Sequence, residues 1–408
     1  MTRSRVDADY SRTECGIYEI SAELNNTVSI AFQPIVNCIE QRIVGYEALV
    51  RGSNNESAET VIAKVTKKNR YTFDQLCRHR ALENASRLGL DLMLSINFLP
   101  NALINPRRCV QSTLDVAQHY NFPPHNIIFE FTEVEKMRDA AHVANIIKTY
   151  KALGFKTAID DFGAGHSNFE RVWNLKPDLV KLDRTLLVRA LSSDKTKSLL
   201  NSLVDLLHQA GCLVVIEGVE DEEQALIAMD SGADFIQGYY FARPQEKPLE
   251  PLEKSDIFKQ LANKYINQQK EVNQKHADSV ENYCRKFRES VLNLQQGLNF
   301  ITACQPLAEL NKSIRCFLTD ELGNQITNTL LFKDNSLSNG KFKQLKLSEN
   351  ANWFRKHYIR HAIEHPSRMY ISRPYRSITG DGLCSTISVA FKILGKTHVL
   401  CFDMEPHS

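Results

Sequence analysis

The chain has 408 residues, of which 43% are hydrophobic and 24% are charged, and its formal net charge is +2. This composition is that of a folded globular protein, and the length favours two or three domains over one. The small net charge argues neither for nor against a nucleic-acid partner in general, and we expect no DNA partner.

The N-terminal residues contain no apolar segment of signal-peptide type, and residues 1–24 are expected to be an N-terminal extension. No run approaches the roughly 20 apolar residues of a membrane-spanning helix. The ten cysteines include no Cys-x-x-Cys pair, so the spacing of a zinc site is absent. We therefore expect a cytoplasmic protein with reduced thiols and no membrane span.

Residues 25–250 alternate apolar runs with amphipathic segments. Segments such as 140–154 and 197–211 have apolar residues at helical spacing and end in glycine, a usual helix stop. Strands that alternate with helices predict a parallel sheet, and eight strands in this length predict an α/β fold of the TIM-like (β/α)8 barrel type. The predicted strands are 30–36, 43–50, 92–97, 127–133, 156–161, 179–183, 212–218 and 235–241.

One connection departs from this alternation. Only residues 37–42 separate the first two predicted strands, whereas a parallel crossover needs about a dozen residues. The first two strands should therefore form a hairpin, so that the barrel contains one antiparallel strand.

Polar residues gather near the C-terminal ends of the predicted strands, which is the face where barrel active sites lie. Lys181 comes just before one of them, and Glu47 lies late in the second strand. Each residue alone could be a helix N-cap or a solvated loop residue, but the whole set on one barrel face favours a binding site. The acidic and amide residues at six strand ends are Asn97, Glu130, Asp160, Asp161, Asp183, Glu217 and Gln237.

Asp160 and Asp161 are adjacent, and neighbouring carboxylates repel each other. Oxygen ligands suit hard cations such as Mg²⁺ or Mn²⁺, and two cations would relieve this repulsion. Because successive strand residues point to opposite faces, both aspartates can reach metal only where the strand ends and bends. Gly163 and Gly165 would permit that bend.

Seven ordered motifs resemble those of the EAL-domain family, which is named after its Glu-Ala-Leu motif, here Glu47, Ala48 and Leu49. The resemblance covers residues 25–250 and implies the same antiparallel strand. Members of this family hydrolyse the bacterial second messenger cyclic di-GMP to the linear dinucleotide pGpG, so the resemblance implies a cyclic-guanylate-specific phosphodiesterase. The motifs are YEALVRG (46–52), SIN (95–97), FEFTE (129–133), IDDFGAG (159–165), VKLDRTLL (180–187), IEGVED (216–221) and QGYYFARP (237–244).

The same resemblance implies a role for each matching residue. Two ions of Mg²⁺ or Mn²⁺ would be bound, with Asp160 between them. Lys181 would orient the attacking water, Glu217 would also take part in catalysis, and Glu133 would hold the 160–165 loop in place. The implied first-metal ligands are Glu47, Asn97, Glu130 and Asp160, the second-metal ligands are Asp160, Asp161 and Glu217, and the positions near the dinucleotide are Gln33, Glu47, Leu49, Arg51, Asn97, Asp183, Glu220, Gln237 and Pro244.

The chain departs from the family pattern near the second metal. Ala164, His166 and Asn168 stand where a Thr or Ser, a Tyr and a Ser are usual, and Gly52 replaces a commonly bulky residue. No implied metal ligand is missing. Besides hydrolysis, two alternatives remain. The altered loop favours a receptor that binds cyclic di-GMP without hydrolysing it, and the other alternative is a signalling scaffold.

Residues 251–296 are expected to form a helical linker, with an apolar stripe from Val280 to Leu294. Packing of this helix against a neighbouring domain is favoured over a dimer-forming coil, although we expect the whole protein to be a homodimer.

Residues 297–408 read as an α+β segment with an antiparallel sheet. A strand, a Gly-Asn turn and a strand at 313–331 precede a helix at 352–365 and strands at 368–377, 384–393 and 397–405. TDELGNQI (319–326) and SRPY (372–375) resemble PAS- or Cache-like sensory domains, which implies that an unknown ligand or protein regulates the enzyme. The helix carries His357, His361 and His365, which could bind a transition metal, but an ordinary solvated helix face is the plainer interpretation.

Overall fold

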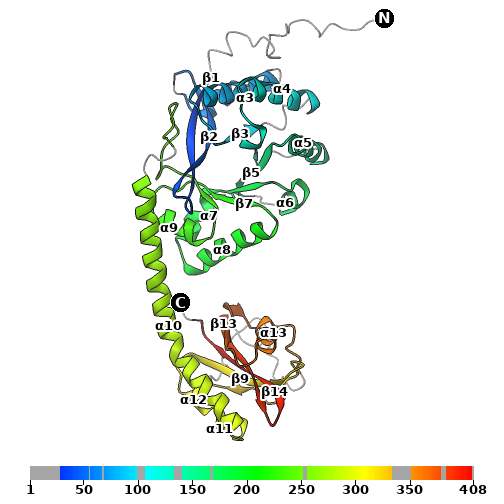
Figure 1. The fold of residues 1–408 in the computed structure, drawn as a ribbon, viewed down its shortest axis with the longest axis vertical. Coiled ribbons are helices and arrows are strands. Elements are labelled where there is room, and N and C mark those ends of the chain that lie inside the picture. Colours follow the sequence, from blue (N-terminus) through cyan, green and yellow to red (C-terminus); the bar gives the residue numbers. More distant parts are fainter. Residues whose placement is uncertain are drawn as a thin grey trace, which may run out of the picture. The chain divides into compact units, whose positions relative to one another are not determined.

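The computed structural model describes residues 28–54, 56–66, 69–98, 106–132, 140–165, 169–250, 255–332, 351–377 and 383–406. The chain divides into two compact units, Met1–Asn267 and Gln268–Ser408, which we call unit 1 and unit 2 and describe one at a time (Figure 1). Among the described residues, no helix is both long and apolar enough to cross a lipid bilayer.

Unit 1 is built around a closed barrel whose strands follow one another in chain order. The first strand runs antiparallel to both of its neighbours, and all other neighbouring strands are parallel. The predicted barrel with one antiparallel strand is therefore confirmed. Asn37 closes the hairpin turn, because its side chain accepts from the N–H groups of Ile39 and Glu40. The strands are β1 (Val28–Asn37), β2 (Arg42–Gly52), β3 (Met93–Phe98), β4 (Ile127–Thr132), β5 (Lys156–Phe162), β6 (Leu179–Leu182), β7 (Leu213–Ile216) and β8 (Phe235–Ile236).

Helices follow the strands and cover the outside of the barrel (Figure 1). The main apolar core of unit 1 combines residues of both layers. In it, Phe129 of β4 and Tyr150 of α5 are both fully buried, with ring centroids 4.3 Å apart. The helices are α2 (Ala58–Ala63), α3 (Arg70–Arg87), α4 (Pro106–His119), η2 (Pro124–Asn126), α5 (Ala140–Ala152), α6 (Phe169–Leu175), α7 (Arg184–Ala190), α8 (Asp194–Gln209) and α9 (Glu222–Asp230).

The barrel interior changes character along the strands. Apolar residues early in the strands form a separate buried cluster. In five strands, the residue two positions after such an apolar residue is polar. Because alternate residues of a strand share a face, the polar side chain points to the same side. These pairs are Ile128 and Glu130, Ala158 and Asp160, Leu179 and Lys181, Val215 and Glu217, and Phe235 and Gln237. The polar side chains are thus collected at the C-terminal ends of the strands.

The eighth strand is shorter than predicted, because Phe235–Ile236 is paired and the rest of 235–241 is not. A turn follows at once, in which the N–H of Phe241 donates to the carbonyl of Gly238 over 3.2 Å. A Cβ on Gly238 would overlap the backbone of Val219, so this glycine lets the loops after β7 and β8 touch. The aromatic composition is typical of a strand, but the close approach of the two loops ends the pairing.

Unit 2 contains the C-terminal part of α10 (Ser255–Gln295) and an antiparallel sheet in the order β10-β9-β14-β13-β11, with β12 beside β13. Phe287 and Leu294 of α10 are buried against one face of the sheet. Ile359 of α13 is buried against the other. The remaining elements are α11 (Phe300–Ala303), α12 (Gln305–Ala308), β9 (Ser313–Asp320), β10 (Leu330–Leu331), α13 (His357–Glu364), β11 (Tyr370–Ile371), β12 (Tyr375–Arg376), β13 (Leu383–Ile393) and β14 (Lys396–Met404). The resemblance to PAS- or Cache-like domains stays a prediction.

The three histidines on and just after α13 pack as aromatic rings. The His361 ring stacks on Tyr370 with centroids 4.2 Å apart and lies 4.7 Å from the ring of His365. The ring of His357 is further away, at 6.0 Å. In the described part of the chain, the group of side chains close enough to share one metal ion lies elsewhere, in unit 1.

Candidate active site

Lys181 lies at the centre of the polar end of the barrel. It is 1% exposed, and its Nζ faces carboxylates from β2, β4, β5 and the loop after β7. These carboxylates are Glu47 at 3.1 Å, Glu130 at 3.0 Å, Asp160 at 3.2 Å and Glu217 at 2.6 Å. The fold thus brings together residues that are far apart in the sequence.

Glu47 is held by amides as well as by the lysine. Its Oε1 accepts from Nδ2 of Asn97 over 3.1 Å, and its Oε2 accepts from Nε2 of Gln237 over 2.7 Å. Nε2 of Gln237 also reaches Oε1 of Gln33 at 3.3 Å. Burial opposes the charge on Glu47, but Lys181 and these hydrogen bonds outweigh it, and the pKa of Glu47 is lowered. Glu47 is therefore a fixed carboxylate.

The other carboxylates around the lysine are not fully compensated. Burial, with the nearby charge of Glu47, raises the pKa of Glu130 well above its usual range. Burial also raises the pKa of Glu217 to about 8, although Lys181 opposes the shift. The surrounding carboxylates overcome the effect of burial on Lys181, whose pKa is raised. One ammonium does not balance four carboxylates.

Two of the predicted metal ligands carry a buried oxygen that could accept a cation. Oε1 of Glu130 is buried and has no hydrogen-bond partner among the described residues, which is costly for an acceptor unless an ion or water binds to it. Asp160 Oδ1 lies 3.2 Å from Nζ of Lys181, but within the described part of the chain it also lacks a hydrogen bond of good geometry. Hard oxygen donors of this kind suit Mg²⁺ and Mn²⁺.

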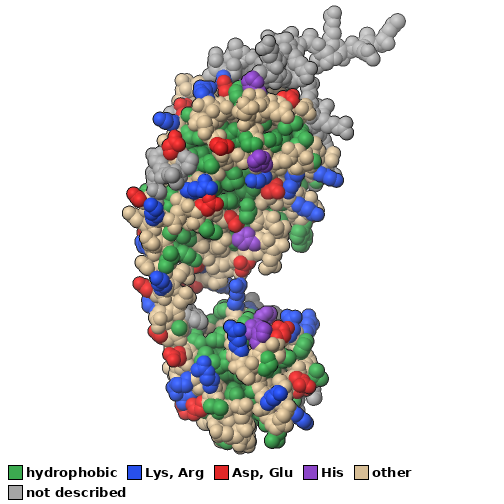
Figure 2. All heavy atoms as spheres, in the orientation of Figure 1, with side chains coloured by type: hydrophobic (Ala, Val, Ile, Leu, Met, Phe, Trp, Pro, Cys, Tyr) green, Lys and Arg blue, Asp and Glu red, His purple; other side chains and the backbone are tan. Residues whose placement is uncertain are grey.

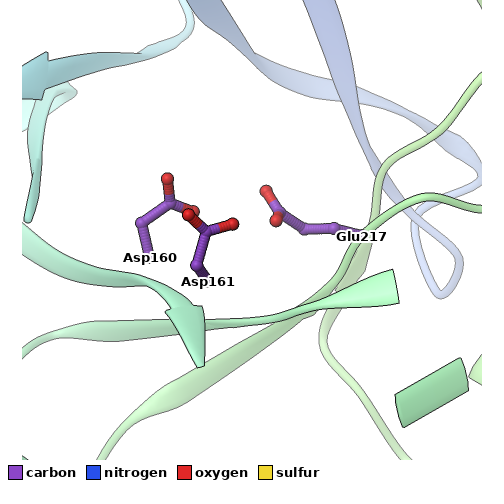
Figure 3. A group of neighbouring side chains, drawn as sticks. All are labelled: Asp160, Asp161 and Glu217. Atoms are coloured by element: carbon purple, nitrogen blue, oxygen red, sulfur yellow. The ribbon is translucent and has the colours of Figure 1, made fainter. Parts of the chain in front are cut away.

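Asp160, Asp161 and Glu217 can each place a carboxylate oxygen within 4.8 Å of the other two. Figure 3 shows the two aspartates side by side at the end of β5, with Glu217 pointing toward them from the loop after β7. Burial and the charge of Asp160 raise the pKa of Asp161 to about 6. The group has the composition of a second cation site.

The bend that lets both aspartates face the site lies in the strand itself. The register between β5 and β6 shifts between Ile159 and Phe162. Asp161 has a φ of 55° and Gly163 a φ of 104°, both in the left-handed region. Asp tolerates this conformation better than most side chains. The bend thus depends on Asp161 and Gly163, and Gly165 has no left-handed φ.

The remaining predicted residues that the structure describes lie near strand ends and in the segments after them. Asp183 is the N-cap of α7, where its side chain accepts from the N–H of Thr185 over 2.9 Å. Arg51 and Leu49 are half-buried on β2, and Pro244 lies in a segment that pairs with β1 at the next residue. Glu133, His166 and Asn168 lie outside the described residues.

One residue in these segments escaped the sequence analysis. Arg184 donates from Nη2 to Oε2 of Glu220 over 2.6 Å. It stands at the first position of α7, where a cation is disfavoured by the helix dipole. That unfavourable position could have been noticed in the sequence, because a cation there is stabilised by an anionic partner.

Comparison with known proteins gives a consistent result. A sequence model of the EAL domain matches residues 19–244. The cyclic di-GMP phosphodiesterase RocR of Pseudomonas aeruginosa is 30% identical over 159 residues, which are 39% of this chain and 40% of RocR. The chain spans less than two thirds of the length of several curated relatives that it matches.

Two solved structures are also similar. A standalone EAL protein of Vibrio cholerae O395 in its c-di-GMP-bound form is 44% identical, covering 56% of this chain and 97% of that one, with a TM-score of 0.52. YkuI of Bacillus subtilis, solved with c-di-GMP and calcium, covers 94% of this chain and 97% of its own with a TM-score of 0.81 at 22% identity. At that identity YkuI shows only that the fold of both units is shared.

Proposed function

The chain belongs to the EAL-domain family, and from that premise we propose that it hydrolyses cyclic di-GMP to linear pGpG with the help of divalent metal ions. The observation that carries the proposal is the set of four carboxylates around Lys181, which, among the described residues, is the one cation that contacts all of them. A phosphodiester carries negative charge of its own, so such a site needs bound cations before it can accept one.

The residues present fit two cations. Glu47, Asn97, Glu130 and Asp160 would hold one, and Asp160, Asp161 and Glu217 the other. Mg²⁺ or Mn²⁺ bound there would supply a hydroxide nucleophile at neutral pH and offset the charge that develops on the phosphate oxygens.

Among the described residues, Lys181 is well placed to orient a nucleophilic water. Its Nζ is buried at the centre of the ligand set, and it retains its proton because the carboxylates stabilise the ammonium. The hydrogen bonds of Gln237 and Asn97 hold Glu47 in one position. A preorganised group of this kind stabilises the transition state without rearrangement during the reaction.

The dinucleotide would lie across the mouth of the barrel. Arg51 offers a planar guanidinium, which can bond two phosphate oxygens at once. The other proposed contacts are Gln33, Leu49, Asp183, Glu220, Gln237 and Pro244. We also propose that unit 2 regulates the activity and that the protein acts as a homodimer.

The deciding experiment is incubation of the full chain with cyclic di-GMP and Mg²⁺ or Mn²⁺, with pGpG measured by chromatography. Turnover is expected with either ion and not with chelator or Ca²⁺, since Ca²⁺ takes more ligands at longer distances. Glu47→Gln keeps the shape of a ligand but removes its charge and should lose about a hundredfold or more in rate. Glu40→Gln, in the exposed turn of the same hairpin, is the control.

The receptor alternative makes a different prediction for the same experiment. Tight binding of cyclic di-GMP by calorimetry, with no pGpG in any divalent metal, would contradict hydrolysis and establish a receptor. Ala164, exposed in the turn beside Gly163, is the described departure from the family pattern that favours this outcome.

A further inference from the structure

The three carboxylates of the second cation site stand just before two tight turns. Asp160 and Asp161 precede Gly163, and Glu217 precedes Gly218. Gly163 has a φ of 104° and Gly218 a φ of 68°, a conformation that glycine adopts without steric cost. The direction in which each carboxylate points therefore depends on how these two turns are held.

The first turn of α7 lies against both of them. A Cβ on Gly163 would lie 2.7 Å from Cγ of Leu186, and a Cβ on Gly218 would lie 2.5 Å from Cβ of Arg184 and 2.6 Å from its Cγ. Neither gap has room for a methyl group. Leu186 and the stem of Arg184 are thus in direct contact with the backbone of the turns that carry the carboxylates.

The guanidinium of Arg184 adds a second contact to that of its stem. The guanidinium of Arg184 reaches Glu220, at the far side of the turn that begins at Glu217. Glu220 is held from the other side, because its N–H donates to Oε1 of the buried Gln224 over 2.9 Å. Because exposed ion pairs usually contribute little to stability, the proposal relies on the packing of the arginine stem on Gly218.

We propose that Arg184 and Leu186 are positioning residues that set the affinity of the Asp160, Asp161 and Glu217 cluster for a divalent cation. The proposal rests on the metal-dependent function proposed above. Ligand directions must be held within a fraction of an ångström for tight metal binding, and residues behind the ligands often change affinity tenfold to a hundredfold. Neither residue touches the reacting atoms; both act through the turns.

The test uses the full chain and two substitutions, Arg184→Ala and Leu186→Ala. Alanine is a good helix former, so α7 itself should persist. Arg189→Ala and Val188→Ala are matched controls, since both residues are exposed on the same helix. The primary readout is the affinity for Mn²⁺ by isothermal titration calorimetry without substrate. Hydrogen exchange of peptides within residues 156–165 and 213–221, in chelator, reports the order of the two turns.

Each positioning variant should bind Mn²⁺ about tenfold or more weakly and exchange faster in these peptides, while both controls match the wild type. Arg184→Lys keeps a stem and a charge and should recover most of the affinity. A purely structural role would lower the melting temperature and leave Mn²⁺ affinity unchanged, and that result would overturn the proposal.

The same experiment distinguishes a failure of the proposed phosphodiesterase activity from a failure of the positioning role of Arg184 and Leu186. A wild-type protein that binds Mn²⁺ but forms no pGpG would contradict the phosphodiesterase activity, and the affinity comparison would still decide the role of Arg184 and Leu186. A wild-type protein with no measurable Mn²⁺ binding would overturn both.

Discussion

Lys181 is held by more negative charge than it can neutralise. Among the described residues it is the cation that contacts Glu47, Glu130, Asp160 and Glu217, each at 3.2 Å or less. Removing one partner from a buried ion pair typically costs about 3–5 kcal/mol, because the remaining charge stays buried without compensation. The lysine therefore has a structural role in addition to any role in the reaction.

Lys181→Met preserves most of the length of the side chain and removes its charge. In chelator we expect the melting temperature of unit 1 to fall by roughly 10 °C, since 1 kcal/mol corresponds to about 2–4 °C in a domain of this size. The rate with Mn²⁺ should fall about a hundredfold or more. Affinity for cyclic di-GMP in Ca²⁺, by calorimetry, should change less than tenfold, about 1.4 kcal/mol.

The comparison of rate and affinity decides the role of Lys181. An interaction made chiefly in the transition state lowers kcat and leaves ground-state binding almost unchanged. If the affinity for cyclic di-GMP falls as far as the rate, Lys181 is a substrate anchor. Lys176→Met, an exposed lysine before β6, should behave as the wild type in all three measurements.

The sequence predicts individual site residues where they belong to a strand, because the strand period determines which way each side chain points. Glu130, Asp160 and Lys181 each follow an apolar residue by two positions, so the strand period places them on the inner face. The contacts among them could not be predicted. The four carboxylates around one lysine have no local pattern, because they come from different strands and loops. The position of Arg184 at the start of a helix can be read from the sequence, but its partner Glu220 cannot, because it lies in another loop.

At the scale of elements, the strand predictions were close where an apolar run ended in a loop. The prediction of 179–183, for example, compares with Leu179–Leu182 in β6. The strand predictions failed where a tertiary contact ended the strand, as after β8, where Gly238 lies against Val219. The helix predicted at 352–365 is shorter, His357–Glu364, because Asn352 is instead paired with Asn324 in an antiparallel bridge.

The bulge in β5 makes a separate prediction for Asp161. Asn tolerates a left-handed φ about as well as Asp, whereas a β-branched residue there costs about 1–2 kcal/mol. Because burial and Asp160 raise the pKa of Asp161 to about 6, its charge destabilises the folded state at pH 8. Asp161→Asn should therefore keep or slightly raise the melting temperature in chelator, and Asp161→Val should lower it by about 2–8 °C.

Both substitutions remove a proposed metal ligand, so both should weaken Mn²⁺ binding at least tenfold by calorimetry. The two variants thus separate the conformational demand of the bulge from the demand for a ligand. Equal melting temperatures for the Asn and Val variants would contradict the backbone argument, whatever happens to metal binding.

At the scale of the whole molecule, each unit has its own apolar core, and α10 contributes to both. Phe258 and Leu261 are buried in the core of unit 1, and Phe287 and Leu294 in that of unit 2. A helix that crosses two cores can couple their unfolding or leave them independent. Calorimetry of the full chain can distinguish coupled unfolding of the two units from independent unfolding.

Phe287→Ala tests the dependence of unit 2 on α10. The ring is fully buried, and such a truncation typically costs about 3–5 kcal/mol. By differential scanning calorimetry we expect two transitions in the wild type and a fall of roughly 10 °C in one of them. Leu292→Ala, on the same helix but 55% exposed, should change neither transition by more than about 2 °C. A single transition that shifts as a whole would show that the units unfold together.

Removal and return of metal provide the complementary measurement, because all the proposed ligands belong to unit 1. A ligand that binds only the folded state stabilises it by RT ln(1 + [L]/Kd), which is about 2.7 kcal/mol at a hundred times Kd. Excess Mn²⁺ should therefore raise the unit 1 transition by about 5–10 °C relative to chelator, and the transition that Phe287→Ala lowers should stay in place. Glu47→Gln should reduce the Mn²⁺ shift, and Glu40→Gln should preserve it. If Mn²⁺ instead stabilises the transition assigned to unit 2, the cation is bound outside the carboxylate cluster and the assignment of the site is wrong.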